Sequence, residues 1–228
     1  MAHPFLAALE RRVLLADGAM GTLLHDRGVP GSACLDEQNL SNPELILSVH
    51  REYLTAGAEI IETNTFGANR LRLRSFGLAD KVAELNAQGA ALAREATRDR
   101  QQAFVAGAIG PVGIGLASGG DTTLKQARRA FAEQAQALIE GGVDLIMLET
   151  FPTLAEAREA VLAVREASAA IPIIAQLTFQ RDGRTWTGEE PADVARELHS
   201  IGADVVGVNC VPGPQAALDV IEELARAS

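Results

Sequence analysis

Aromatic residues are scarce in this 228-residue sequence, at 4% of positions. Its apolar runs are all too short to cross a lipid bilayer, which argues against a membrane role. In the opening segment MAHPFLAALERRVLLADGAM, Asp17 interrupts the apolar stretch and no convincing small-residue cleavage site follows. We therefore expect a mature cytoplasmic protein.

Cysteine is also rare, with only Cys34 and Cys210 present. The two lie far apart in different contexts, which is not typical of a disulfide framework and fits a reducing compartment. Cys34 stands in a polar loop and is predicted to be a surface thiol. Cys210 closes an apolar run, where a cysteine is more often a small buried side chain than a ligand.

Positive charge is in deficit, because 20 Lys and Arg face 30 Asp and Glu and give a net charge of −10. The basic residues are scattered rather than gathered into a stripe, which disfavours nucleic acid as a partner. None of the four histidines falls at a predicted strand end, and neither His50 nor His199 has a second ligand at metal spacing. The sequence therefore does not offer histidines in positions suited to a metal site or a catalytic triad.

The 47% of hydrophobic residues suffices for one α/β core. Short runs rich in Val, Ile and Leu alternate with longer segments of helical period, a pattern typical of parallel strands joined by crossover helices. Strands are predicted at 13–17, 59–64, 104–109, 144–149, 172–178 and 204–209. Helices are predicted at 43–56, 79–98, 124–140, 154–168, 191–200 and from about 214.

Local signals support this layout. Ser41 followed by Glu44 predicts a capping box, and Pro43 fits the first turn of the helix at 43–56. A weak repeat joins the segments AGAEIIETN (56–64), GGVDLIMLE (141–149) and IGADVVGVN (201–209). Its glycines, expected to be left-handed at helix ends, are Gly57, Gly142 and Gly202. Its last positions, at equivalent strand ends, are Asn64, Glu149 and Asn209.

The strand-helix order favours an α/β fold of the (β/α)8 TIM-barrel type, with about six of the eight units present in this chain. A doubly wound open sheet is the alternative, and it too would place ligands at the carboxyl ends of its strands. Polar residues that close apolar strands are therefore the candidates for chemistry.

Three strand ends carry such candidates. Asp17 and Gly18 combine a carboxylate with backbone amides, a pairing suited to an amino acid, although an ordinary Asp-Gly turn explains them as well. The polar cluster ETNTFGAN (62–69) indicates either a site or a structural hydrogen-bond network. Glu149 needs a partner such as a ligand ammonium or an internal arginine, because an unpaired carboxylate behind four apolar residues is unfavourable.

Cys210 shares a cavity with Asn209 only if it lies just past the regular end of its strand. Successive residues of a strand point to opposite faces, so a regular strand that turns Asn209 inward turns Cys210 outward.

Several motifs together resemble the homocysteine S-methyltransferase family. They are DGAMGTLL (17–24), NLSNPELI (39–46), AGAEIIETNTFGAN (56–69), GAIGPVG (107–113), LIMLETF (145–151) and GVNCVPGP (207–214). Within that family the sequence is most similar to the homocysteine-binding module that opens cobalamin-dependent methionine synthase, and to bacterial fusions of this module with a methylenetetrahydrofolate reductase. Betaine-homocysteine methyltransferase is a more distant relative.

The resemblance implies a zinc-dependent enzyme that methylates the thiol of homocysteine and forms methionine, with a folate- or cobalamin-borne methyl group. It assigns Cys210 as one of three thiolate zinc ligands. The other two are adjacent cysteines that do not occur before Ser228. We therefore expect residues 1–228 to form a barrel truncated on its C-terminal side, with an incomplete zinc site.

By the same resemblance, substrate-binding roles fall on residues at four strand ends. Those expected to hold the amino-acid end of homocysteine are Asp17, Gly18 and Glu149, and those expected to line the cavity are Thr63, Asn64, Thr65 and Asn209. A donor-carrying module and a downstream folate or reductase module are the implied partners. Two alternatives stay open: the same barrel using S-methylmethionine or betaine as donor, and an inactive binding fragment.

Overall fold

The computed structural model describes residues 3–100, 102–113 and 122–227. Its strands are β1 (Ile60–Glu62), β2 (Phe104–Ile109), β3 (Leu145–Phe151), β4 (Ile173–Leu177) and β5 (Val205–Val208). The longer helices are α4 (Pro43–Ala56), α6 (Val82–Thr97), α8 (Leu124–Glu140), α9 (Leu154–Ala167), α10 (Pro191–Ser200) and α11 (Pro214–Ala227). The shorter ones are α1 (Pro4–Leu9), α2 (Met20–Asp26), α3 (Gln38–Ser41), α5 (Arg70–Leu73), η1 (Arg74–Phe76) and η2 (Ala79–Lys81).

The five strands form one parallel sheet in chain order, from β1 to β5. The segment predicted as the first strand, 13–17, is reduced to an isolated parallel bridge between Ala16 and Ile60. Around that bridge the Asp17 N–H donates to the Ile60 carbonyl at 2.9 Å. Parallel strands in chain order, each followed by a helix, make this an α/β fold and part of a (β/α)8 barrel, as predicted.

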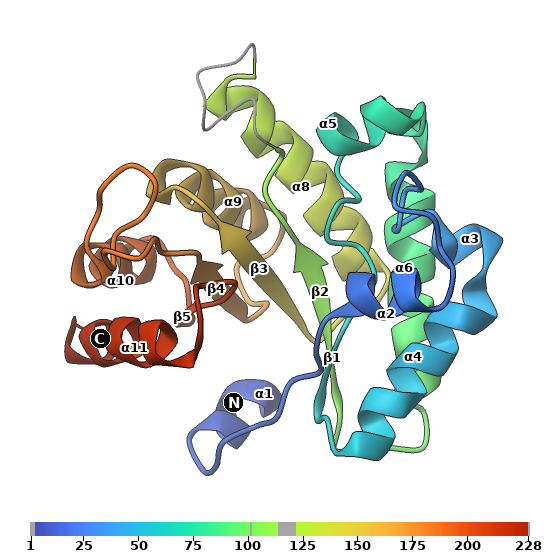
Figure 1. Cartoon of the computed structure of the whole chain (residues 1–228), viewed down its shortest axis with the longest axis horizontal. Coiled ribbons are helices and arrows are strands. Elements are labelled where there is room, and N and C mark those ends of the chain that lie inside the picture. Colours follow the sequence, from blue (N-terminus) through green and yellow to red (C-terminus); the bar gives the residue numbers. More distant parts are fainter. Residues whose placement is uncertain (1–2, 101, 114–121, 228) are drawn as a thin grey trace.

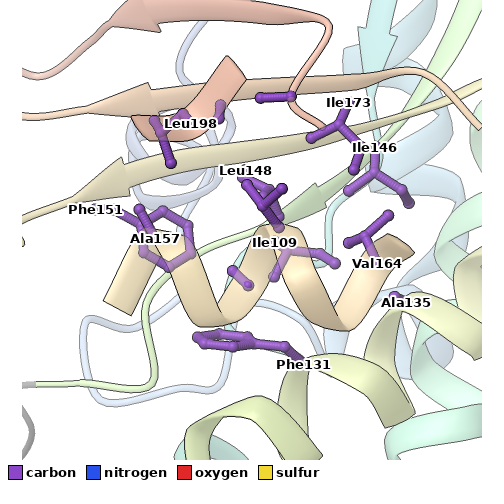
Figure 2. Close-up of a cluster of buried hydrophobic side chains, with 14 of the residues drawn as sticks. Ile109, Phe131, Ala135, Ile146, Leu148, Phe151, Ala157, Val164, Ile173 and Leu198 are labelled. Atoms are coloured by element: carbon purple, nitrogen blue, oxygen red, sulfur yellow. The ribbon is translucent and has the colours of Figure 1, made fainter. Parts of the chain in front are cut away.

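The helices follow one another around the outside of the sheet, each packed on the next from α4 to α11 (Figure 1). Between the sheet and these helices lies the main hydrophobic core, where strand residues such as Ile109, Ile146 and Leu148 meet Phe131 of α8 and Val164 of α9 (Figure 2). Alternate strand residues thus face the helices, which leaves the others to line the inner face of the barrel.

Near the amino ends of the strands, the inner face of the sheet is covered by side chains, including those of α1. Phe5 of α1 is fully buried and packs with Ile60, Ala106, Leu145 and Met147. Its ring also meets Phe104 edge-on, at 5.4 Å between centroids. Side chains therefore cover the inner face at the amino ends of the strands. The carboxyl ends form the open face of the partial barrel.

The repeated acids of the sequence brace the amino ends of the strands. Asp144 accepts the Val105 N–H at 2.7 Å and Asp204 accepts the Ile173 N–H at 2.8 Å. Each of these carboxylates also pairs at 2.6 Å with an arginine of a preceding helix, Arg94 and Arg165 respectively. The acid of the repeat is thus a structural element that joins one strand to the strand before it.

Helix ends agree with the sequence except at one cap. The repeat glycines Gly57, Gly142 and Gly202 have φ of 107°, 85° and 104°, in the left-handed region as expected. Helix α4 begins at Pro43 as predicted, but the capping box at Ser41 is wrong. Asn42 is the N-cap and makes no side-chain cap, because Ser41 belongs to α3 and donates to Glu37 at 2.7 Å.

In the part of the chain that the structure describes, every helix is too short or too polar to span a membrane.

Candidate active site at the carboxyl ends of the strands

Three carboxylates from separate segments of the chain meet at the open face of the barrel. Asp17 follows the bridge at Ala16, Glu62 ends β1, and Glu149 lies near the end of β3. Asp17 Oδ2 accepts the Glu62 N–H at 3.0 Å, and the side chains of Glu62 and Glu149 hydrogen-bond each other. All three side chains are half-buried. Glu62 belongs to the polar cluster 62–69 noted in the sequence, but no substrate-binding role was predicted for it.

The pKa values of all three acids are raised. Burial raises the pKa of Asp17 to about 7, opposed by the Glu62 N–H and reinforced by the charge of Glu149. Burial, together with the charges of Glu149 and Asp17, raises the pKa of Glu62 well above its ordinary value. Burial also raises the pKa of Glu149, while its hydrogen bond with Glu62 lowers it. Like charges held together in a poorly solvated place resist joint ionisation.

No lysine, arginine or histidine within the described ranges pairs with these three carboxylates. The internal arginine that would explain Glu149 structurally is therefore not found there. A cluster of carboxylates without a cation is suited to a positively charged ligand group, because such a group relieves the repulsion among them.

Asn209 joins the ends of β3 and β5. Its Nδ2 donates to Glu149 Oε2 at 3.2 Å and to Thr150 Oγ1 at 2.9 Å, while its Oδ1 accepts the Thr150 N–H at 2.9 Å. Thr150 has a positive φ of 61°, a conformation that a β-branched residue rarely adopts. The Asn209 amide thus fixes both the direction of the Glu149 carboxylate and a strained backbone next to it.

Cys210 reaches the same region by leaving the strand geometry. Strand β5 ends at Val208, and Cys210 has a φ of 51° in the left-handed region. Its sulfur lies 3.5 Å from Thr150 Oγ1, and its backbone carbonyl accepts from Thr178 Oγ1 at 2.9 Å. The side chains of Asn209 and Cys210 therefore both contact Thr150 at the end of β3, and Cys210 lies past the regular end of its strand. A shared substrate site for the two residues stays a prediction.

The predicted cavity residues Thr63, Asn64 and Thr65 are buried and hydrogen-bonded to the protein. The two threonine hydroxyls lie 2.6 Å apart, and that of Thr65 donates to the Ala108 carbonyl at 2.8 Å. Asn64 Nδ2 donates to the Leu35 carbonyl at 2.7 Å. These contacts are those of the structural network that the sequence left open as an alternative, and a substrate-lining role for the three residues stays a prediction.

Gly18 lies beside Asp17 at the rim of the site. A Cβ at this position would lie 3.0 Å from the Tyr53 hydroxyl, and that hydroxyl donates to the Ala19 carbonyl at 3.3 Å. Tyr53 of α4 therefore supports the turn after Asp17 and leaves little room for a side chain at Gly18.

The second cysteine belongs to a separate, buried cluster. Cys34 was predicted to be a surface thiol, but it is buried and its sulfur lies 3.7 Å from Asp36 Oδ2. Burial, followed by the charge of Asp36, raises the pKa of Cys34 to about 11. Within residues 3–100, 102–113 and 122–227, no three His, Cys, Asp or Glu side chains are grouped so as to hold a metal ion. Cys210 is thus one thiol donor and does not by itself fit a zinc centre.

A partial TIM barrel with ionisable residues at the carboxyl ends of its strands is the architecture of a barrel enzyme. The family model for homocysteine S-methyltransferase matches residues 14–228. The chain therefore belongs to the homocysteine S-methyltransferase family.

Curated relatives and a solved structure agree with this assignment. The chain is 33% identical to methionine synthase of Mycobacterium leprae and 34% identical to that of Mycobacterium tuberculosis, in both cases over 97% of its length. It spans only 19% and 20%, respectively, of those two proteins. The metallated form of the homocysteine methyltransferase MmuM from Escherichia coli superposes with a TM-score of 0.83 at 27% identity, covering 97% of this chain and 83% of that one.

Proposed function

We propose that this chain is the substrate-binding barrel of an enzyme that transfers a methyl group to the thiol of homocysteine and forms methionine. The sulfur attacks the methyl carbon, the bond between the methyl group and its donor breaks, and the thiol proton is released. In this proposal Asp17 and Glu149 hold the ammonium group of homocysteine, with Glu62 beside them, and Asn209 orients Glu149.

The observation that carries the proposal is the group of three carboxylates, which have no cationic partner among the described residues. An amino acid supplies one ammonium group, and Glu62, which contacts both Glu149 and Asp17, brings the carboxylates close enough together to share it. The Cys210 thiol lies beside Thr150 at the same end of the barrel, which supports a site for the sulfur of the substrate there.

The methyl donor belongs to the same proposal. The likeness to methionine synthases supports a cobalamin- or folate-borne methyl group, delivered by a module elsewhere in a longer protein. S-methylmethionine or betaine is the alternative donor, and an inactive binding fragment is the alternative of another class.

Zinc is the cofactor that the family resemblance implies, with Cys210 as one thiolate ligand. The described residues contribute this single thiol, so a complete centre needs donors from elsewhere. In the longer protein, Cys210→Ala should abolish metal retention, as measured by elemental analysis. A Cys210→Ala variant that keeps one zinc per chain would show that Cys210 is not a zinc ligand.

The test of substrate recognition is calorimetric titration with homocysteine. Glu149→Ala should weaken binding by about tenfold or more, because the ammonium loses a carboxylate partner. Glu223→Ala removes an exposed carboxylate of α11 and is the matched control. Equal homocysteine affinities for the wild type and both variants would show that Glu149 does not bind the substrate. Methionine formation from each of the four donors, followed by mass spectrometry, separates the donor alternatives.

A further inference from the structure

A cleft of about 300 Å³ lies between the segment α5–η1 and the first half of α8. These two elements follow β1 and β2 in the chain, and both lie at the end of the molecule toward which the strand arrows point (Figure 1). The side chains that matter for its chemistry are Arg70, Leu71, Arg74, Gln126, Arg129 and Glu133.

The charge of this cleft is opposite to that of the chain as a whole. Three guanidinium groups face one carboxylate in its lining, whereas the protein carries a net charge of −10. Glu133 is already engaged, because its two oxygens accept from Arg70 Nε at 2.9 Å and Arg70 Nη2 at 2.5 Å. Arg70 Nη1 also lies 3.5 Å from Oδ1 of the exposed Asp80. With both carboxylates counted, the three guanidinium groups still leave an excess of positive charge at the cleft.

Arg74 and Arg129 provide the unbalanced charge. Both are exposed, and neither guanidinium has an ion-pair or hydrogen-bond partner among the residues that the structure describes. Most arginines of this chain do have such partners, for example Arg94 with Asp144 and Arg165 with Asp204. Two unpaired guanidiniums at one cleft match the planar, bidentate recognition of phosphate and carboxylate groups.

The remaining lining residues complete a site for a small organic anion. Gln126 uses its Oε1 to accept the Thr123 N–H at 2.8 Å, which leaves its side-chain NH2 as a further donor. Leu71 and Ala130 give an apolar surface for the carbon part of a ligand. The cleft is distinct from the carboxylate cluster, which suits a cation.

We propose that this cleft is a binding site for a small anion with at least two negative charges, carried on phosphate or carboxylate groups. Arg74 and Arg129 hold the charges, Arg70 is released in part from Glu133 to assist, and Gln126 donates to a free oxygen. The site does not depend on the methyl-transfer reaction.

The experiment is calorimetric titration of the protein with two probes, pyrophosphate and citrate, in a low-salt amine buffer. The double variant Arg74→Gln/Arg129→Gln should bind the preferred probe about tenfold or more weakly than the wild type. The control Arg98→Gln/Arg100→Gln removes the same charge from exposed positions outside the cleft and should change affinity less than about twofold. The probe that binds more tightly identifies phosphate or carboxylate as the natural group.

A third variant gives a change in the opposite direction that misfolding cannot produce. Glu133→Gln removes the competing carboxylate from Arg70 and should strengthen binding several-fold. The proposal is overturned if the control pair weakens binding as much as the cleft pair, if Glu133→Gln weakens it, or if neither probe binds the wild type saturably below roughly 10 mM.

Discussion

If the carboxyl groups of Asp17, Glu62 and Glu149 bind an ammonium group as proposed, each of them favours ligand binding at the expense of the stability of the unliganded fold. Each is held in a place where its ionised form is disfavoured, so each raised pKa means that ionisation weakens the folded state. A ligand ammonium reverses this balance. The unliganded protein should therefore become more stable when one of the acids is neutralised, whereas the complex should become weaker.

Glu62→Gln tests this opposition. The folded-state pKa lies above the unfolded value, so the folded protein binds more protons and loses stability as pH rises through the interval between the two. At pH 7 the neutral amide should raise the unfolding free energy by about 1–3 kcal/mol and weaken homocysteine binding. Thermal denaturation and titration calorimetry measure the two effects, with exposed Glu223→Gln as control. A lower melting temperature together with unchanged binding would contradict the assignment.

Asp17 predicts a pH dependence for binding. Its pKa of about 7 means that the carboxylate needed for an ammonium becomes protonated as pH falls from 8 to 6. Homocysteine affinity should therefore decrease over this interval, and Asp17→Asn should bind more weakly with a flatter profile. Calorimetry at pH 6, 7 and 8 provides the measurement. An affinity of the wild type that is constant over these three values would exclude Asp17 as the ionising partner.

The sequence predicted which strand ends carry polar residues but not which of those residues face inward. The repeat aligns Asn64 with Glu149, yet β1 ends at Glu62 and the chain then turns Asn64 toward Leu35. The end of a strand depends on tertiary hydrogen bonds that local pattern does not encode. The same limit applies to Cys210, whose left-handed φ is a product of the folded turn.

At the level of elements, the helical period of the sequence predicted the helices well. The apolar runs predicted short strands at the edge of the sheet poorly. Helices α4, α8 and α10 begin and end at the residues predicted, because their apolar stripes and punctuating residues agree. The strand predicted at 13–17 carries the same apolar signal as the others. It has a described neighbour on one side only, β1, and forms a single bridge there. Whether such a segment forms a strand depends on its pairing with distant segments rather than on its own strand propensity.

Helix α6 offers a test of packing at this level. Gly89 faces the polar network, and a Cβ there would lie 2.6 Å from Thr65 Cγ2 and 2.9 Å from Asn39 Nδ2. Alanine normally favours a helix interior over glycine, but here it should destabilise the protein by about 1–3 kcal/mol through overpacking. Gly31→Ala, where no atom lies within 4 Å of the added carbon, is the control and should be nearly neutral. Chemical denaturation compares the two; a stabilised Gly89→Ala protein would contradict the observed packing.

At the level of the whole molecule, the two margins of the sheet differ from its centre. Val13 and Leu15 are 92% and 57% exposed at one margin, and Leu218 and Ile221 of α11 are exposed beside the other. Strand β5 pairs with β4 alone among the described strands. We propose that further strands of a complete barrel cover both margins, as the likeness to MmuM supports.

Hydrogen exchange measures this difference between margins and centre. Backbone amides of 13–17 and of β5 should exchange at least about tenfold faster than those of β2 and β3, because one side of each marginal segment has no paired strand among the described residues. Mass spectrometry of peptic fragments gives the rates, and fragments of α8 and α9 serve as internal references. Equal protection across the sheet would show that both margins are already covered.

The amide of Asn209 has a consequence for the order in which the protein is made. It contacts Glu149 across 60 residues of chain, so at ribosomal rates of about 5–20 residues per second it is synthesised about 3–12 s after its partner. Throughout that interval the nascent chain holds Glu149 and the Thr150 N–H without the side chain that orients them. The hydrogen bonds between the ends of β3 and β5 can therefore form only after residue 209 has been made, and a pause in translation before it would lengthen the time during which Glu149 and Thr150 lack this partner.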